Sequence, residues 1–405
     1  MNNSLNKILK PFLEIGKSKN ITNIKILLFK LNDEAFKSLD FENDRIYQEP
    51  LLISYFNDKK DLRTKLDQII IGYELSKKQT IEIRTDEFGR VYLPNIGWFN
   101  MKLKDENLLF SKDEFKFYYK TKKVDFSYEP IEFIKNTKIE ILKYPIPLLK
   151  QCYFNVNGEV VDVEIENISK KQLINITKAY NIIKINCPSQ FELIEKHALK
   201  CVISNTDTFQ RNSFASNYAH GIGFYNAYQD DYDEVFFTDD IAHQTGHILF
   251  STVLFQTNNF FKIDKSTVLE KLTMPNGDLI EKRSFNIVFH ALYTYYTSFI
   301  CLDACLTNNV WKGKQKHEAM GRIAFYINKC YRDILLIDNP INSEEKSLEY
   351  FTNDGILIYR ELKIKWKEMY EKWFEITKHF DMSNQPYNFT YTDFLKLNPL
   401  PKLKE

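Results

Sequence analysis

The chain has 405 residues, 44% hydrophobic and 15% aromatic, so it can bury a core large enough for one elaborated domain or for two or three. Its charged residues nearly cancel to a formal net charge of +1, which gives no electrostatic reason to expect nucleic acid or a membrane surface as a partner. No run reaches the roughly 18 apolar residues of a membrane span, and six scattered cysteines are typical of a reducing compartment, so we expect a cytoplasmic protein.

The first section of the chain, residues 1–78, is predicted to be helical. Residues 5–16 and 60–77 carry apolar residues at helical spacing with charged residues between them.

Residues 79–167 have the patterns of strands. TIEIRT, FKFYYKTKKVDFSY and KIEILKY alternate or are rich in β-branched and aromatic residues. In YFNVNGEVVDVEI, two strand-like runs flank Asn157-Gly158, which predicts a hairpin. We therefore expect a β-rich module here, which is a candidate for binding a peptide.

From residue 168 to residue 405 helical periodicity dominates. The predicted helices cover residues 170–186, 189–200, 237–256, 283–307, 314–336 and 355–380. Two short strands, CVISN and GIGFYNAY, interrupt them.

A pair of histidines four residues apart lies in EVFFTDDIAHQTGHILFSTVLF. His243 and His247 would project from one face of a helix and could bind one metal ion. Thr238 or Asp239 could cap that helix at its N-terminus. The alternative is two histidines without a shared ligand, because such a pair arises by chance in about one chain in ten with this many histidines.

The order of the elements around this pair is that of a zincin metalloprotease. A short strand precedes the two-histidine helix, and a zincin uses its edge strand to hold an extended peptide. The motif of a zinc hydrolase is H-E-x-x-H, but the sequence reads HQTGH, with Gln244 in the position of the general base. An amide cannot accept a proton from metal-bound water at neutral pH, so metal binding is retained but the hydrolytic base is absent. The predicted fold class is α+β: a helix-rich, zincin-like metal-binding catalytic domain over residues 168–405, preceded by the β-rich module and the N-terminal helical segment.

Several residues could supply the third metal ligand. His290, in the helical run RSFNIVFHALYTYYTSF, is the first candidate, and His220, on the strand before the motif, is the second and could instead face substrate. The remaining histidines, His197, His317 and His379, lie among charged residues and are expected to face solvent. The acidic candidates are Asp239, Asp240 and Asp303, of which the first two are expected to cap the helix. The cysteines of CLDAC, Cys301 and Cys305, are expected to pack in the core.

Arg283 lies seven residues before His290. If the helix already covers Arg283, the two share a face about 10 Å apart along the axis. A metal near His290 and the guanidinium of Arg283 could then hold the two ends of a short dicarboxylate. The alternative is a surface arginine beside Glu281 and Lys282.

These residues resemble the HExxH-type 2-oxoglutarate-dependent peptide β-hydroxylases associated with ribosomally synthesised peptide natural products. The resemblance covers residues 170–306 and depends on SFASNYAHGIGFYNAY, DDIAHQTGHILF and RSFNIVFHALYTY. It implies that His243, His247 and His290 bind Fe(II) and that Arg283 holds the C5 carboxylate of 2-oxoglutarate. The implied reaction is hydroxylation of a side-chain β-carbon in a precursor peptide.

The sequence departs from that family at Gln244, where the family has Glu, and at Ser284, where Pro is expected. The first departure leaves the iron ligands in place and favours an oxygenase over a hydrolase. Three histidines also differ from the common facial triad of two histidines and a carboxylate. The alternatives are a zincin-like peptide- or metal-binding protein without turnover, a divergent zinc metallopeptidase, or a helical interaction scaffold with incidental histidines.

Overall fold

The computed structural model describes residues 4–58, 64–76, 80–155, 157–255, 260–273, 279–338, 345–385 and 388–400. These residues form a mixed α and β fold with several sheets, as the sequence predicts at that coarse level. The part of the chain that is described contains no helix long and apolar enough to cross a membrane.

The chain divides into two compact units, and neither is continuous in sequence. The helical unit comprises Met1–Gly16, Leu173–Ile194 and Gln229–Glu405, and the β-containing unit comprises Lys17–Gln172 and Glu195–Tyr228. The predicted division of the chain into three parts, residues 1–78, 79–167 and 168–405, stays a prediction.

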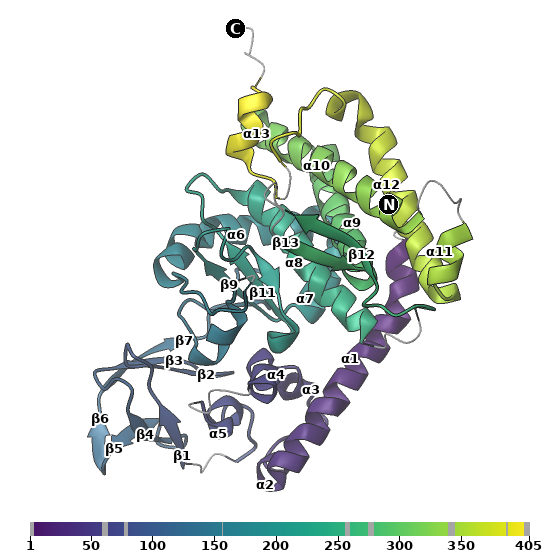
Figure 1. Cartoon of the computed structure of the whole chain (residues 1–405). Helices are drawn as coiled ribbons and strands as arrows, with labels where there is room; N and C mark the ends of the chain where they lie inside the picture. Colours follow the sequence, from purple (N-terminus) through teal and green to yellow (C-terminus); the bar gives the residue numbers. More distant parts are fainter. Residues whose placement is uncertain are drawn as a thin grey trace. The chain divides into compact units, whose positions relative to one another are not determined.

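The helices that lie in the helical unit, or cross into it, are α1 (Ser4–Leu31), α6 (Glu166–Asn186), α7 (Pro188–His197), α8 (Glu234–Leu254), α9 (Phe285–Thr307), α10 (Gly313–Asp338), α11 (Glu345–Tyr350), α12 (Asn353–Thr377) and α13 (Tyr391–Leu397). Helix α9 packs between α8 and α10, and α12 covers α9 and α10 (Figure 1). A two-stranded hairpin, β12 (Val268–Thr273) with β13 (Leu279–Ser284), leads directly into α9.

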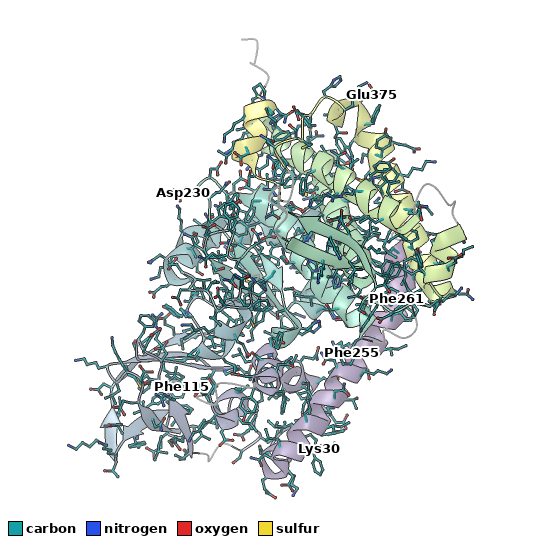
Figure 2. The ribbon with its side chains drawn as sticks, in the orientation of Figure 1. Lys30, Phe115, Asp230, Phe255, Phe261 and Glu375 are labelled. Carbon is teal, nitrogen blue, oxygen red and sulfur yellow. The ribbon has the colours of Figure 1, made fainter. Side chains whose placement is uncertain are left out.

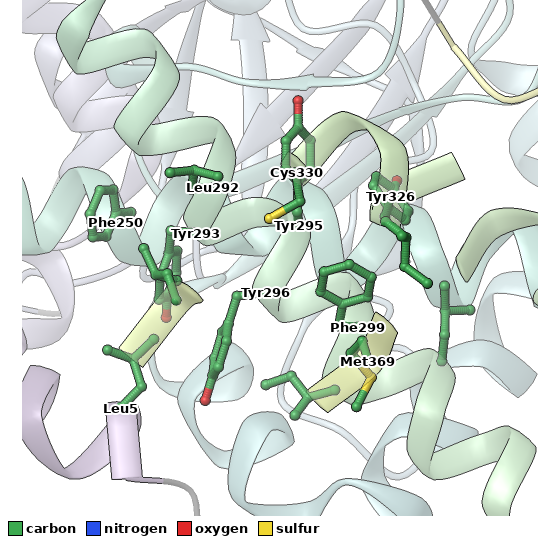
Figure 3. Close-up of a cluster of buried hydrophobic side chains, with 14 of the residues drawn as sticks. Leu5, Phe250, Leu292, Tyr293, Tyr295, Tyr296, Phe299, Tyr326, Cys330 and Met369 are labelled. Atoms are coloured by element: carbon green, nitrogen blue, oxygen red, sulfur yellow. The ribbon is translucent and has the colours of Figure 1, made fainter. Parts of the chain in front are cut away.

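The helical unit has a core rich in tyrosine and phenylalanine. Helix α9 is buried along almost its whole length because FNIVFHALYTYYTSFICLDACLT has apolar or hydroxyl side chains on every face. Figure 3 shows Tyr293, Tyr295 and Tyr296 of α9 among residues of α1, α8, α10 and α12. The hydroxyl of Tyr295 points in the opposite direction from those of the other two.

The β-containing unit holds three of the sheets. Its short helices are α2 (Asp33–Lys37), α3 (Asp44–Tyr47), α4 (Pro50–Asn57), α5 (Leu66–Ile70) and the 3-10 helices η1 (Pro147–Cys152) and η2 (Asn217–Ala219). The first sheet has the strand order β1-β4-β5-β6 and consists of β1 (Thr80–Arg84), β4 (Asn107–Ser111), β5 (Lys116–Tyr119) and β6 (Lys122–Val124). The second sheet has the strand order β2-β3-β7 and consists of β2 (Arg90–Leu93), β3 (Gly97–Met101) and β7 (Phe126–Pro130). The two share a core centred on Phe99, Phe110 and Phe117, with Phe115, labelled in Figure 2, partly exposed beside it. The strands of both sheets lie within residues 79–167, where strand patterns were predicted.

The third sheet of this unit has the order β10-β11-β9-β8, from β8 (Glu140–Ile141), β9 (Lys200–Ser204), β10 (Phe214–Ala215) and β11 (Ile222–Asn226). Strands β9 and β11 are parallel and fully buried. The strand that was expected to be an edge strand, β11, is internal, because Phe214 and Ala215 of β10 pair with it.

Three expectations about elements were wrong in extent. Within residues 60–77, the described part contains only α5 as a helix, and residues 59–63 and 77–79 lie outside the described residues. The hairpin at Asn157-Gly158 is short: its flanks pair through a bridge between Phe154 and Val160 and through backbone hydrogen bonds from Asn155 to Glu159 and from Val161 to Tyr153, and the described residues on either side are too few to form strands. The helix expected to begin at residue 283 begins at Phe285, because Arg283 belongs to β13.

Candidate metal centre

The three predicted histidine ligands lie on two adjacent helices of the helical unit. His243 and His247 are on α8, and His290 is on α9. The two helices approach closely at Gly246, where an added Cβ would lie 2.5 Å from Oγ1 of Thr297. The glycine of HQTGH therefore permits the approach that places His290 beside the histidine pair.

The three imidazoles form a row with His247 in the middle. The ring centroids of His243 and His247 are 5.1 Å apart, and those of His247 and His290 are 4.8 Å apart. Nε2 of His290 lies 3.3 Å from the backbone carbonyl oxygen of His247, to which it can donate a hydrogen bond when it carries the proton. The structure thus brings together the three histidines selected from the sequence pattern.

Burial keeps these imidazoles neutral. Desolvation lowers the pKa of His243 to about 4 and the pKa of His290 to about 4. The pKa of His247 is also well below its ordinary value, because of burial and then of the neighbouring His290 and His243. A neutral imidazole is the form that binds a metal, so none of the three rings would have to lose a proton at pH 7 to act as a ligand.

The donor set suits a divalent transition metal. Imidazole nitrogen is a good ligand for iron and zinc, and Nδ1 of His243 is buried without a hydrogen-bond partner. Among the residues that the structure describes, however, no three His, Cys, Asp or Glu side chains already surround a common point that could hold an ion. The imidazoles would have to rotate out of their row, a change in side-chain torsion angles, to share one ion.

Gln244 lies buried between the two histidines of α8 in sequence. Its Nε2 donates a hydrogen bond to Oδ1 of Asp240 at 3.0 Å, and its Oε1 is buried without a hydrogen-bond partner. Neither atom of the amide can take a proton from water at neutral pH. The position of the hydrolytic base therefore holds a group that cannot perform that role.

The structure agrees with neither position that the sequence suggested for Arg283, on the helix of His290 or on the surface. It is buried, so it is not a surface arginine, and it precedes α9 in β13, so it shares no helical face with His290. Its two terminal nitrogens each lie 2.6 Å from an oxygen of Asp333, and Nη1 also lies 3.0 Å from Oε2 of Glu270. The guanidinium fork is thus occupied by carboxylates of the protein, and it does not fit a second role in holding 2-oxoglutarate while that ion pair is closed.

The start of α8 also differs from expectation. Asp233 caps the helix, accepting a hydrogen bond from the backbone N–H of Val235 at 2.8 Å. Thr238, Asp239 and Asp240 lie inside the helix and do not cap it. Ser284, in place of the expected proline, is the N-cap residue of α9.

Two tyrosines beside His243 were not predicted. The ring of Tyr326 stacks on His243 with centroids 5.9 Å apart, and that of Tyr295 lies 6.1 Å away. The hydroxyl of Tyr326 donates to Oδ2 of Asp239, and that of Tyr295 is hydrogen-bonded with Asp333. Tyr326 and Asp333 are on α10, and no spacing rule relates them to the motif on α8. Asp239 was named from the sequence as an acidic candidate, but as a cap of the helix and not as a neighbour of His243 one turn away.

The remaining histidines lie elsewhere. His220 follows η2 in the β-containing unit and is half-buried, and its role with substrate stays a prediction. His197 is buried and His317 is half-buried against Tyr391 and Phe394, so the expectation of solvent-facing rings was wrong for both. His379 is exposed as predicted.

The cysteines of CLDAC pack in the core, as expected. Cys301 and Cys305 are buried on α9, and Asp303 between them pairs with Lys372 and accepts a hydrogen bond from Nε1 of Trp373.

Comparison of the chain with protein-family models gives no match, and comparison with curated proteins gives none either.

Proposed function

We propose that this chain is an Fe(II)-dependent oxygenase that uses 2-oxoglutarate to hydroxylate a side-chain β-carbon in a ribosomally made precursor peptide. The observation that carries the proposal is the row of three neutral imidazoles, His243, His247 and His290, on two helices packed together. Fe(II) bound there would supply the activation of oxygen, which needs no carboxylate base. Gln244 supports this class over a hydrolase, because its amide cannot activate water.

Arg283, which was expected to hold the co-substrate, already pairs with Asp333. Arg283 could receive the far carboxylate of 2-oxoglutarate only after its ion pair with Asp333 opens. We expect the far carboxylate of 2-oxoglutarate to compete with Asp333 for the guanidinium of Arg283.

Anaerobic titration with Fe(II) and 2-oxoglutarate tests the proposal. Chelation of 2-oxoglutarate to the iron should give a weak visible charge-transfer band, and admission of oxygen should then yield succinate. His243→Ala is the negative control. If the parent protein binds Fe(II) but shows neither band nor succinate, the oxygenase assignment fails.

A second titration tests the third ligand. His290→Ala should lose most of the iron bound after anaerobic reconstitution, because two imidazoles hold a metal far more weakly than three. His317→Ala is the matched control, since His317 is a half-buried histidine of the same unit that lies among aromatic rings of α13. Full iron occupancy in His290→Ala would place the third ligand elsewhere, and His220 would then be tested next.

A second candidate function is metal or peptide binding without turnover. The closed ion pair between Arg283 and Asp333 favours it, because this pair leaves the guanidinium no free fork for a co-substrate. This candidate predicts tight iron binding that 2-oxoglutarate does not perturb. A divergent zinc peptidase is disfavoured by Gln244, and cleavage of a peptide library by the zinc-loaded protein above a His243→Ala control would revive it.

A further inference from the structure

A buried hydrogen-bonded cluster lies beside His243, between α8 and α10. Nη1 of Arg322 donates to Oδ2 of Asp239 at 2.9 Å, and the hydroxyl of Tyr326 donates to the same oxygen at 3.1 Å. Nε and Nη2 of Arg322 both donate to Oε1 of Glu318, at 3.0 and 2.7 Å. The three charged residues are each at most 3% exposed. The cluster therefore fixes the carboxylate of Asp239 through one of its oxygens only.

Two atoms in this region lack partners. Oδ1 of Asp239 and Nδ1 of His243 are both buried without a hydrogen bond. The two residues are four apart on α8, so their side chains are neighbours on one face of the helix. Buried polar atoms are nearly always paired, so two complementary orphan atoms on neighbouring side chains indicate a hydrogen bond, direct or through one water.

The nitrogen of His243 that carries no proton is the one that can bind a metal, so the tautomer of the ring matters. A neutral imidazole carries one N–H and one lone pair, and a hydrogen bond from Nδ1–H leaves the lone pair on Nε2. A carboxylate that accepts from the far nitrogen of a metal-bound histidine fixes the ring and makes it a stronger ligand. It also brings negative charge, which three neutral imidazoles do not.

We infer that Asp239 is the positioning residue of His243, accepting a hydrogen bond from Nδ1–H so that Nε2 is presented to a divalent metal ion. The inference rests on the proposed function in one respect, that His243 is a metal ligand. The hydrogen bonds from Arg322 and Tyr326 hold Asp239 in place, and Glu318 is hydrogen-bonded to Arg322 rather than to Asp239.

Cobalt(II) binding tests the inference, with Co(II) as a spectroscopic probe and competition with a chelator as the measure of affinity. Asp239→Asn should bind Co(II) about 10- to 100-fold more weakly than the parent, the usual effect of removing such a carboxylate. Glu318→Gln is the matched control, because it also removes a buried carboxylate from Arg322 but leaves Asp239 beside His243, and its affinity should stay within about twofold. If Asp239→Asn binds as tightly as the parent, or if Glu318→Gln weakens binding equally, the cluster is only structural and the inference is overturned.

The ¹⁵N spectrum of the His243 imidazole in the metal-free parent gives a second, independent readout. The inference requires Nδ1 to carry the proton, and a proton on Nε2 overturns it, even where Asp239→Asn fails to fold. If the parent binds no Co(II) while Nδ1 is protonated, the proposed metal function fails and the hydrogen bond to Asp239 stands.

Discussion

The guanidinium of Arg283 holds together residues from two separate parts of the helical unit. It lies on β13, and its partners are Asp333 on α10 and Glu270 on β12. Asp333 is fully buried, Arg283 is its bidentate ion-pair partner, and the hydroxyl of Tyr295 is also hydrogen-bonded with it. These contacts show that Arg283 stabilises the packing of β12, β13 and α10.

Arg283→Ala should therefore destabilise the fold rather than act only on the co-substrate. It would leave the carboxylate of Asp333 buried without its partner, which should lower the free energy of unfolding by about 3–5 kcal/mol. Urea denaturation of the variant measures this change. Arg332→Ala is the control, because Arg332 pairs with the same Glu270 but is half exposed, and its removal should cost less than about 1 kcal/mol. A fully stable Arg283→Ala that loses only its response to 2-oxoglutarate would restore the role first expected from the sequence.

At the scale of elements, Gly246 sets how closely α8 and α9 pack. A glycine inside a helix normally costs about 1 kcal/mol relative to alanine, so its presence needs a reason. The nearest atoms to an added Cβ belong to Thr297 and Thr294 of α9, at 2.5 Å for Oγ1 of Thr297. The gain in helix propensity from an alanine would be smaller than the cost of separating two packed helices.

Gly246→Ala should lower the free energy of unfolding by about 1–3 kcal/mol and weaken Co(II) binding, because α9 and His290 would move away from α8. The double variant Gly246→Ala with Thr297→Ala removes the closest atom and should recover part of both losses, with Thr297→Ala alone as the reference. Thermal unfolding and Co(II) titration measure the two effects. An alanine variant at least as stable as the parent, with unchanged metal affinity, would show that the helices do not need the glycine.

Long helices and several short strands were predictable from the sequence, whereas the hairpin of β12 and β13 was not. Helices α8, α9, α10 and α12 lie within a few residues of their predicted ranges, because each has a long periodic or apolar run. Strands β12 and β13 were missed, since the charged residues in VLEKLT and LIEKRS interrupt any alternation of apolar and polar positions. The helix expected over residues 60–77 is much shorter, because local apolar spacing does not show where packing stops.

The site was predictable where its residues repeat on one helix and not where they meet across helices. The pair His243 and His247 follows from the period of α8, and His290 from a strongly helical run. Tyr326 and Arg322 join the site only because α10 packs near α8, a contact that no local pattern encodes. His197 was misplaced for a related reason: Glu195 and Lys196 are its neighbours in sequence, but its own ring faces the core.

At the scale of the whole chain, the two units are each assembled from distant segments. Contacts such as that of Lys200 on β9 with Glu49 and Glu140 connect residues about 60 to 150 positions apart within the β-containing unit. These three charged side chains are all buried, and Tyr92 also donates to Glu140. Buried ion pairs therefore help to join distant segments of this unit, and the amino-acid composition does not show which charged residues are buried.

Two histidines with lowered pKa values should make the β-containing unit sensitive to acid. Burial lowers the pKa of His197 to about 3, with Lys17, His220 and Lys196 adding to the effect, and burial lowers the pKa of His220 to about 4. Both values lie below the ordinary value of about 6.5 in an unfolded chain. Below pH 6.5 the unfolded chain therefore binds protons that the native protein does not, so stability is fully present above that pH and is lost as the pH falls toward 4.

The slope of the unfolding free energy against pH gives the contribution of His197. Each such histidine should contribute a slope approaching about 1.4 kcal/mol per pH unit between pH 6 and pH 4.5. His197→Asn should reduce the slope of the unfolding free energy by about one such increment, measured by urea denaturation across that range. His379→Asn is the control, because His379 is exposed and its substitution removes no buried imidazole. Equal slopes for the parent and His197→Asn would mean that His197 takes up its proton in the native state, and that the ring becomes accessible to solvent as the pH falls.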